Sequence, residues 1–132
     1  PRGMTDPSAG PLSGYRVLEL GANLTGPVAT MLMADQGADV IKLETAGGDQ
    51  LRHLGARRDG VRGMGTMFLN ANRNKRSVVL DLKSGEGLAQ ALDLAASCDV
   101  VVQNFRPDVL ERLGLGYDAV RGRRPDIVYV SI

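Results

Sequence analysis

Residues 16–27 read RVLELGANLTGP, and this stretch decides the fold class. Residues 16–20 are rich in aliphatic side chains, which predicts a short strand. Residues 21–26 are mostly small and predict a tight loop. Pro27 then suits the first turn of a helix, where its missing N–H leaves no bond unmade.

The residues that follow complete a strand, loop, helix and strand. Val28, Met31 and Leu32 fall on one helical face, and Gly37 is typical of a helix end. Residues 39–43 predict the next strand. The whole run occupies about 30 residues, the length of a βαβ unit.

The same alternation continues to the end of the chain. Residues 45–65 contain six glycines and predict a long loop with a helical turn near Leu51, and residues 66–69 form a short apolar segment. The later elements are strands over 77–82, 99–102 and 127–132, a helix capped by Ser84 with Leu88, Ala91, Leu92 and Ala95 as its apolar stripe, and helices over 108–113 and 117–122. This pattern predicts an α/β fold with a Rossmann-like, doubly wound, mainly parallel sheet.

The chain has 132 residues, which fits one domain. A domain of this size buries roughly two-thirds of the surface that its unfolded chain exposes, enough for one core. Residues 1–11 are rich in Pro, Gly, Ser and Thr and predict a flexible tail, so the folded domain is expected over 12–132. Because the last residues read as an apolar strand, we expect a longer protein cut within its domain.

The charge balance argues against one broad class of function. The formal net charge is +1, whereas a general nucleic-acid binder carries a strongly basic domain. Basic residues do cluster locally, which is typical either of a solvated surface or of a site for a small polyanion. The clusters are Arg57, Arg58 and Arg62, then Arg73, Lys75 and Arg76, then Arg121, Arg123 and Arg124.

The numbers of cysteines and histidines and the hydropathy of the chain exclude several further kinds of site and location. Cys98 is the single cysteine, which excludes an internal disulfide and a cysteine-rich metal site. His53 is the single histidine and lies in a glycine-rich loop, so neither a metal centre nor a Ser-His-Asp set is expected. Without a signal peptide or a long apolar run, the sequence predicts a cytoplasmic protein with no membrane span.

Three segments follow strands or flank them, where an open α/β sheet binds its ligands. Residues 21–27 let the backbone approach a ligand, or form only a tight turn. In residues 104–107, Asn104 offers an amide, Phe105 a ring to stack and Arg106 a planar donor fork, unless this is simply an exposed loop. Residues 72–77 place three cations before a strand that ends near Lys83, or form a polar turn.

Together these segments resemble the family III CoA-transferases, the group that contains formyl-CoA transferase, carnitine CoA-transferase-like proteins and α-methylacyl-CoA racemase. The resemblance runs in the family's order from Pro11 to Ile132. It is carried by PLSGYRVLEL (11–20), GP (26–27), GADVIKLE (37–44), GD (48–49), NRNKRSVVLDLK (72–83), DVVVQNFRP (99–107) and LG (113–114).

The resemblance implies a CoA-binding Rossmann-like large domain, a smaller second domain and an interlocked homodimer. It assigns the coenzyme A site to Leu24, Thr25, Thr45, Leu80, Asp81, Leu82, Lys83, Asn104, Phe105, Arg106 and Arg112. Thr45 departs from the arginine with which some members hold a CoA phosphate, and Arg52 or Arg73 are possible substitutes.

The resemblance also implies the chemistry. In the transferases an aspartate attacks an acyl-CoA thioester, and CoA passes through enzyme-bound intermediates to a second carboxylic acid. In the racemases a His/Asp pair moves the α-proton instead. Both catalytic sets are expected beyond Ile132, so no catalytic residue is expected within this chain. The third alternative is an isolated CoA-binding or inactive fragment.

Overall fold

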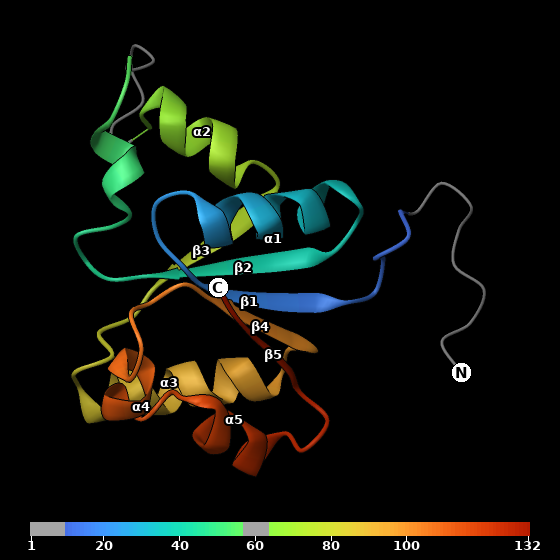
Figure 1. The fold of residues 1–132 in the computed structure, drawn as a ribbon, viewed down its shortest axis with the longest axis vertical. Helices are drawn as coiled ribbons and strands as arrows, with labels where there is room; N and C mark the ends of the chain where they lie inside the picture. The colour runs from blue at the N-terminus through green and yellow to red at the C-terminus, as the bar shows by residue number, and fades with distance from the viewer. Residues whose placement is uncertain (1–9, 57–63) are drawn as a thin grey trace.

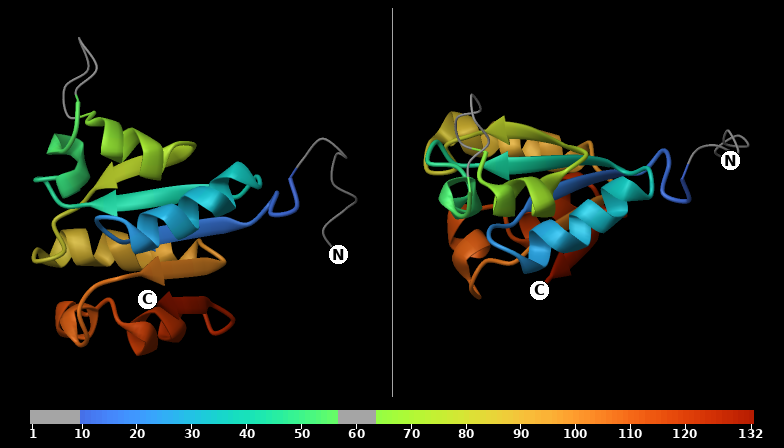
Figure 2. Two further views of the ribbon diagram at one scale, coloured as in Figure 1. Left: turned by 45° about the horizontal axis from the view of Figure 1, so that its top comes forward. Right: turned by 90° about the horizontal axis from the view of Figure 1, so that it is seen from above.

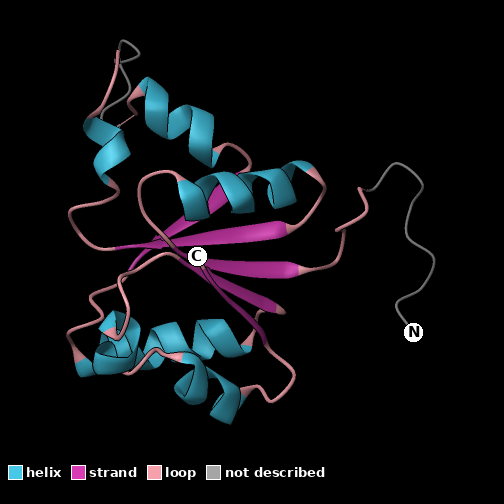
Figure 3. Ribbon diagram, in the orientation of Figure 1, coloured by secondary structure: helices cyan, strands magenta, loops and turns pink. Residues whose placement is uncertain are grey.

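A computed structural model describes residues 10–56 and 64–132. The described residues form one five-stranded sheet with helices on both faces (Figures 1 and 3). Along the chain the elements are β1 (Arg16–Leu20), α1 (Thr25–Asp35), β2 (Asp39–Glu44), the 3-10 helix η1 (Gln50–His53), α2 (Thr66–Asn72), β3 (Lys75–Val79), α3 (Gly85–Ala96), β4 (Val100–Gln103), α4 (Val109–Leu113), α5 (Tyr117–Arg123) and β5 (Val128–Ser131).

The strand order is β3-β2-β1-β4-β5, and all four neighbouring pairs are parallel. The Rossmann-like, doubly wound sheet expected from the sequence is therefore confirmed. All carboxyl ends lie on the same side of the sheet, as the strand arrows in Figure 2 show. The order reverses between β1 and β4, and ligands in open α/β sheets bind in the crevice beyond such a switch point.

Successive side chains of each strand point to opposite faces, and each face has its own core. On one face Leu18, Leu20 and Val101 pack against α3, α4 and α5, which lie below the sheet in Figure 1. On the other face Val17 and Val40 pack under α1, which lies above the sheet.

Helix α3 begins as the sequence predicts. The Ser84 hydroxyl oxygen accepts a hydrogen bond of 3.0 Å from the Gly87 N–H, which satisfies one of the open donors at the helix start. Gly87 packs so closely that a Cβ there would lie 2.1 Å from the Asp81 carbonyl oxygen. Ala91 and Ala95 are fully buried, as their place in the predicted apolar stripe requires.

Two elements differ from the sequence prediction by more than one residue at an end. Residues 66–69 are the first half of helix α2 rather than an isolated apolar segment. The strand expected over 77–82 is β3, which begins and ends earlier because it pairs with β2 from Lys75 opposite Val40 to Val79 opposite Glu44. Since β2 ends at Glu44, the ladder has no partner beyond Leu80.

A ladder of charged groups crosses the amino-terminal edge of the sheet. The Asp39 carboxylate accepts hydrogen bonds from Arg76 (2.6 and 2.9 Å) and from Arg16 (3.0 Å). The Asp99 carboxylate accepts from the Arg16 N–H (2.8 Å) and from Arg124 (2.9 Å). Partial burial raises the pKa of the Asp39 carboxyl, but the two guanidinium groups outweigh burial and hold that pKa below its usual range.

Two glycine substitutions test the packing of the helices. Gly122→Ala, in α5 with open space around its Cβ position, should stabilise the fold by about 0.5–1 kcal/mol because alanine loses less backbone entropy. Gly87→Ala should destabilise it by about 1–3 kcal/mol, since the added methyl overlaps the Asp81 carbonyl. Urea unfolding followed by circular dichroism measures both, and equal effects of the two changes would contradict this description.

Candidate functional site

A hollow of about 200 Å³ opens at the carboxyl ends of β1 and β2, and we call it the β1–β2 hollow. Leu20 ends β1 and Glu44 ends β2 there, and the loop after β1 faces the loop after β2 across it. Among the predicted site residues it brings together Thr45, Leu82 and Phe105. Its lining is Leu20, Gly21, Ala22, Asn23, Leu43, Glu44, Thr45, Gly48, Asp49, Gln50, Leu82 and Phe105.

A second hollow of about 390 Å³ lies at the ends of β4 and β5, and we call it the β4–β5 hollow. Arg106 and Phe105 contribute to its lining, together with Asp108 and Glu111 from the start of α4. Phe105 lines both hollows and is 37% exposed, so its ring stands between them. A partly exposed ring between two concave surfaces is suited to stacking on a flat ligand group.

The other predicted residues surround the hollows without lining them. Leu24 and Thr25 are exposed at the start of α1, and no side chain caps that helix. Leu80 packs against the core cluster, while the Asp81 carboxylate accepts from the Lys83 N–H at 3.0 Å and so shapes its own turn. Arg112 is exposed on α4.

Asn104, a predicted contact of the CoA site, bonds to the loop after β1 in the structure. Its side-chain oxygen accepts from the Ala22 N–H at 3.0 Å, and its amide nitrogen donates to the Ala22 carbonyl at 2.9 Å and to the Thr25 hydroxyl at 3.0 Å. The amide that we expected to meet a ligand is thus occupied within the protein. Asn104 fastens the loop after β1 to the end of β4, across the switch point.

The basic residues divide into two groups. Within residues 10–56 and 64–132, Lys83, Arg106, Arg112 and Arg121 have no carboxylate partner, and the first three belong to the predicted CoA site. By contrast, Arg52 pairs with Glu44 and Arg73 with Asp35, each at 2.5 Å. The two proposed substitutes for the missing phosphate contact are therefore already engaged. Arg57, Arg58 and Arg62 lie outside the described residues.

A third hollow, of about 180 Å³, shows that a large number of basic side chains does not by itself indicate an anion-binding site. Its lining includes five basic side chains, those of Lys42, Arg52, Arg73, Lys75 and Arg76. Each of these is paired with a carboxylate, so the surface is locally balanced in charge. The basic run 73–76, one of the three segments considered from the sequence, serves the structure of the domain.

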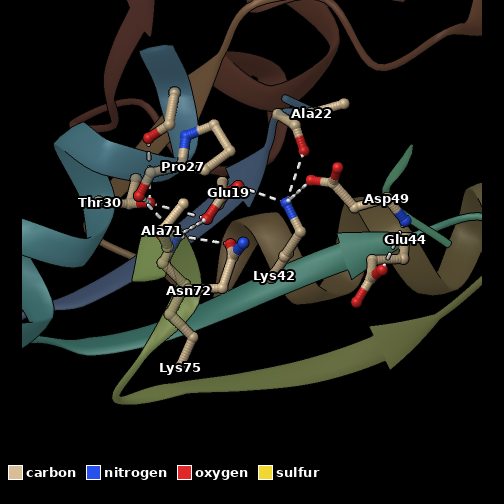
Figure 4. A network of polar contacts seen from close by, with 12 residues as sticks. Glu19, Ala22, Pro27, Thr30, Lys42, Glu44, Asp49, Ala71, Asn72 and Lys75 are labelled. Atoms are coloured by element: carbon tan, nitrogen blue, oxygen red, sulfur yellow. Dashed lines mark hydrogen bonds and ion pairs between the residues drawn. The ribbon is translucent and has the colours of Figure 1, made fainter. Parts of the chain in front are cut away.

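A buried network of charged side chains lies next to the β1–β2 hollow, between the sheet and helices α1 and α2 (Figure 4). The Glu19 carboxylate accepts from Lys42 and from Lys75, both at 2.7 Å, and from the Thr30 hydroxyl at 2.7 Å. The Lys42 ammonium also lies 2.9 Å from the Asp49 carboxylate. Glu19, Lys42, Lys75 and Asp49 have side chains at most 2% exposed. Burial lowers the pKa of the Lys75 ammonium, and Glu19 restores it only in part.

Our sequence analysis missed this network, although β2 carries a signal for it. Lys42 and Glu44 alternate with Ile41 and Leu43 in a central strand, where a parallel sheet normally has aliphatic residues on both faces. Buried charges are rare unless they are paired, so alternating charges in such a strand indicate an internal ion-pair system.

Glu44 lines the β1–β2 hollow and joins Asp49 of the network to Arg52 on η1. Its carboxylate accepts from Arg52 (2.5 and 2.8 Å), from the Ser77 hydroxyl (2.7 Å) and from the Asp49 N–H (2.9 Å). The Arg52 guanidinium in turn lies 3.8 Å from the centre of the Phe68 ring. Burial alone would raise the pKa of Glu44, but these donors outweigh it and lower the pKa to about 2.

Acid unfolding tests the pairing of Glu44. Because its pKa is lower in the folded chain than the ordinary value of 4.5, its ionised form stabilises the fold above pH 4.5, and this contribution disappears as pH falls towards 2. Glu44→Gln should therefore be less stable than the parent chain at pH 7, and the difference should shrink between about pH 4.5 and 2. Urea unfolding at several pH values measures it, and a difference independent of pH would contradict the pairing.

Residues 10–56 and 64–132 contain no cluster of three or more His, Cys, Asp or Glu side chains suited to a metal ion. No helix there has both the length and the apolar character needed to cross a bilayer. His53 is exposed on η1.

Comparison with known proteins gives a consistent result. The family model described as CoA-transferase family III matches residues 12–132. A probable fatty acyl-CoA transferase of Mycobacterium tuberculosis is 41% identical over 128 residues, which are 97% of this chain and 32% of that protein. The succinyl-CoA:glutarate CoA-transferase of Mus musculus is 44% identical over 123 residues, which are 92% of this chain and 28% of that protein.

Solved structures agree. A crystal structure of the M. tuberculosis protein has a TM-score of 0.85 at 42% identity, over 93% of this chain and 34% of that chain. A CAIB/BAIF family protein from Brucella suis has a TM-score of 0.87 at 36% identity, over 93% of this chain and 33% of that chain. This chain thus spans about a third of the length of these relatives.

Proposed function

This chain belongs to CoA-transferase family III, and we propose that it supplies the CoA-binding part of an enzyme that moves CoA between carboxylic acids. The observation that carries this proposal is the distribution of charge at the carboxyl edge. Within the described ranges, the three cations of the predicted site, Lys83, Arg106 and Arg112, have no carboxylate partners, and Arg106 lines one of the two hollows that share Phe105.

Coenzyme A matches this edge group by group. Its adenine is a flat ring that can stack on Phe105, and its phosphates carry the negative charge that unpaired cations attract. In this assignment Arg106, Arg112 and Lys83 hold phosphate, and Thr45 and Leu82 border the nucleotide. Leu24 and Thr25 approach it from the loop after β1, while Leu80, Asp81 and Asn104 shape the loops around it.

The chemical step belongs to a carboxylate that we do not assign to any described residue. In the proposed reaction an aspartate attacks the thioester carbonyl of an acyl-CoA, forming an acyl-aspartyl anhydride and releasing the CoA thiolate. The thiolate then attacks the anhydride at the aspartyl carbonyl, and the donor acid leaves. Finally the acceptor acid attacks the enzyme thioester, forming a second anhydride and releasing the CoA thiolate. The thiolate attacks the acceptor's acyl carbonyl, which gives the new acyl-CoA and frees the aspartate. Asp49 is buried against Lys42 and Asp81 bonds to its own loop, so neither is placed as that nucleophile.

A racemase of the same family is the second candidate, because it would share this CoA-binding part. The relatives favour transfer, since several carry the name of a succinyl-CoA transferase with a dicarboxylic acceptor, glutarate or mesaconate. We therefore take dicarboxylic acids as the first pair of substrates to test. We also propose that the active enzyme is a homodimer.

Isotope exchange separates these functions. With the full-length protein, transfer should move CoA from succinyl-CoA to labelled glutarate or mesaconate, whereas a racemase should exchange the α-proton of a 2-methylacyl-CoA with deuterium from solvent. The chain of 132 residues alone should catalyse neither. Proton exchange without CoA transfer would overturn the proposal in favour of the racemase.

Alanine substitutions test the CoA site. Arg106→Ala and Arg112→Ala should each weaken CoA binding about 10- to 100-fold, because a hydrogen bond to a charged group contributes about 1.5–3 kcal/mol. Calorimetric titration of the full-length protein with CoA measures the affinity. Arg121→Ala is the matched control, since Arg121 lies on α5 and its guanidinium faces the Tyr117 ring at 5.8 Å. Unchanged affinity in both site variants, or an equal loss in the control, would refute the assignment.

A further inference from the structure

We propose that Lys42 and Asp49 are positioning residues that hold the loop after β1, residues 21–24, in the conformation that receives CoA. The inference rests on the proposed function, because it concerns the same ligand. It assigns a role to two members of the buried network that are not predicted ligand contacts and yet bond the backbone of one wall of the β1–β2 hollow.

Asp49 connects the two walls of that hollow. Its side chain is 1% exposed. One carboxylate oxygen accepts from the Leu51 N–H at 2.9 Å and from the Asn23 N–H at 3.4 Å, and the other lies 2.9 Å from the Lys42 ammonium. The Asp49 N–H donates to Glu44 at 2.9 Å. The loop after β2 and the loop after β1 are thus joined through this one carboxylate.

Lys42 holds the other end of the same short stretch. Its ammonium donates to the Gly21 carbonyl at 2.8 Å and to Glu19 at 2.7 Å, in addition to its pairing with Asp49. Ala22 lies between Gly21 and Asn23. The Asn104 side chain accepts from the Ala22 N–H and donates to the Ala22 carbonyl. Three consecutive backbone units are therefore fixed by side chains from three different parts of the chain.

The loop needs such fixing because its conformation is not one that the backbone adopts by default. Asn23 has a φ of 64°, in the left-handed region that costs energy for a residue with a Cβ. Gly21 leaves little room as well, since a Cβ there would lie 3.0 Å from the Asn104 side-chain oxygen. The contacts of Asp49, Lys42 and Asn104 hold this geometry beside the start of α1.

Stability alone does not account for the buried pair. Replacing a buried ion pair with apolar residues of similar volume is often neutral or stabilising, whereas removing one partner is strongly destabilising. An apolar pair would fill the same space beneath the hollow. It could not donate to the Gly21 carbonyl or accept from the Asn23 N–H, so orientation of the loop is a property that an apolar pair would lack.

Asp49→Asn tests the inference with little change of shape. The amide keeps an oxygen for the Leu51 N–H but removes the charge that faces Lys42. We expect amide hydrogen exchange at Ala22 and Asn23, measured by NMR, to become at least tenfold faster. We expect the dissociation constant for CoA, measured by calorimetry on the full-length protein, to rise at least tenfold while unfolding stays cooperative. Asp93→Asn is the matched control, because Asp93 pairs with Arg123 on the exposed surface, and it should change neither quantity.

The double variant Lys42→Met/Asp49→Leu separates positioning from stability, and it decides the matter should Asp49→Asn fail to fold. Lys75 and Thr30 still bind Glu19 in this variant. If the pair positions the loop, the double variant should fold cooperatively and still bind CoA at least tenfold more weakly. Parent-like affinity in a folded Asp49→Asn or double variant, with unchanged exchange at Ala22 and Asn23, would overturn the inference. Failure of the parent protein to bind CoA would instead refute the proposed function, and the exchange rates would still test the hold on the loop.

Discussion

The Glu19 carboxylate accepts hydrogen bonds from two buried ammonium groups, and the carboxyl edge of the sheet is organised around it. Lys42 and Lys75 approach its two oxygens from β2 and β3, and each lysine also donates to backbone carbonyls of other elements. These carbonyls belong to Gly21, Pro27 and Ala71, so one carboxylate links the sheet, the start of α1 and the end of α2. Charges removed from water are costly unless they are fully bonded, and this system satisfies each ammonium with several oxygens.

The two ends of the sheet use charge in opposite ways. At the amino-terminal edge the arginines are paired with aspartates, and the surface there is neutral over short distances. At the carboxyl edge, within the described residues, the cations of the predicted site face solvent without such partners. Because a paired cation has already exchanged its water for a carboxylate, only the unpaired cations have charge to offer a ligand. This contrast separates the cations of the predicted site from the arginines that pair with aspartates at the other edge.

Much of the fold could be predicted because hydrophobic periodicity and helix caps are local signals. The strand over 16–20, the cap at Ser84 and the helix end at Gly114 follow from neighbouring residues alone. The limits of β3 could not be predicted from neighbouring residues, because they depend on where β2 ends. The position of Phe105 and Arg106 at the carboxyl edge could be predicted because they follow a strand. The occupation of Asn104 by Ala22 and the burial of Lys42 depend on contacts between distant segments, which one sequence does not disclose.

The ladder of Arg76, Asp39, Arg16, Asp99 and Arg124 also has a consequence for how the strands assemble. Arg76, Asp39, Arg16 and Asp99 lie at or next to the starts of β3, β2, β1 and β4, and Arg124 ends α5 just before β5. The ladder is therefore complete only when these strands are aligned. A strand paired one residue out of place turns its charged group to the opposite face and leaves its neighbours unmatched. The ladder thus penalises misaligned pairing at every joint of the sheet. It does so at the end of the strands away from the two hollows, so the loops at the other end are free to diverge without loss of folding fidelity.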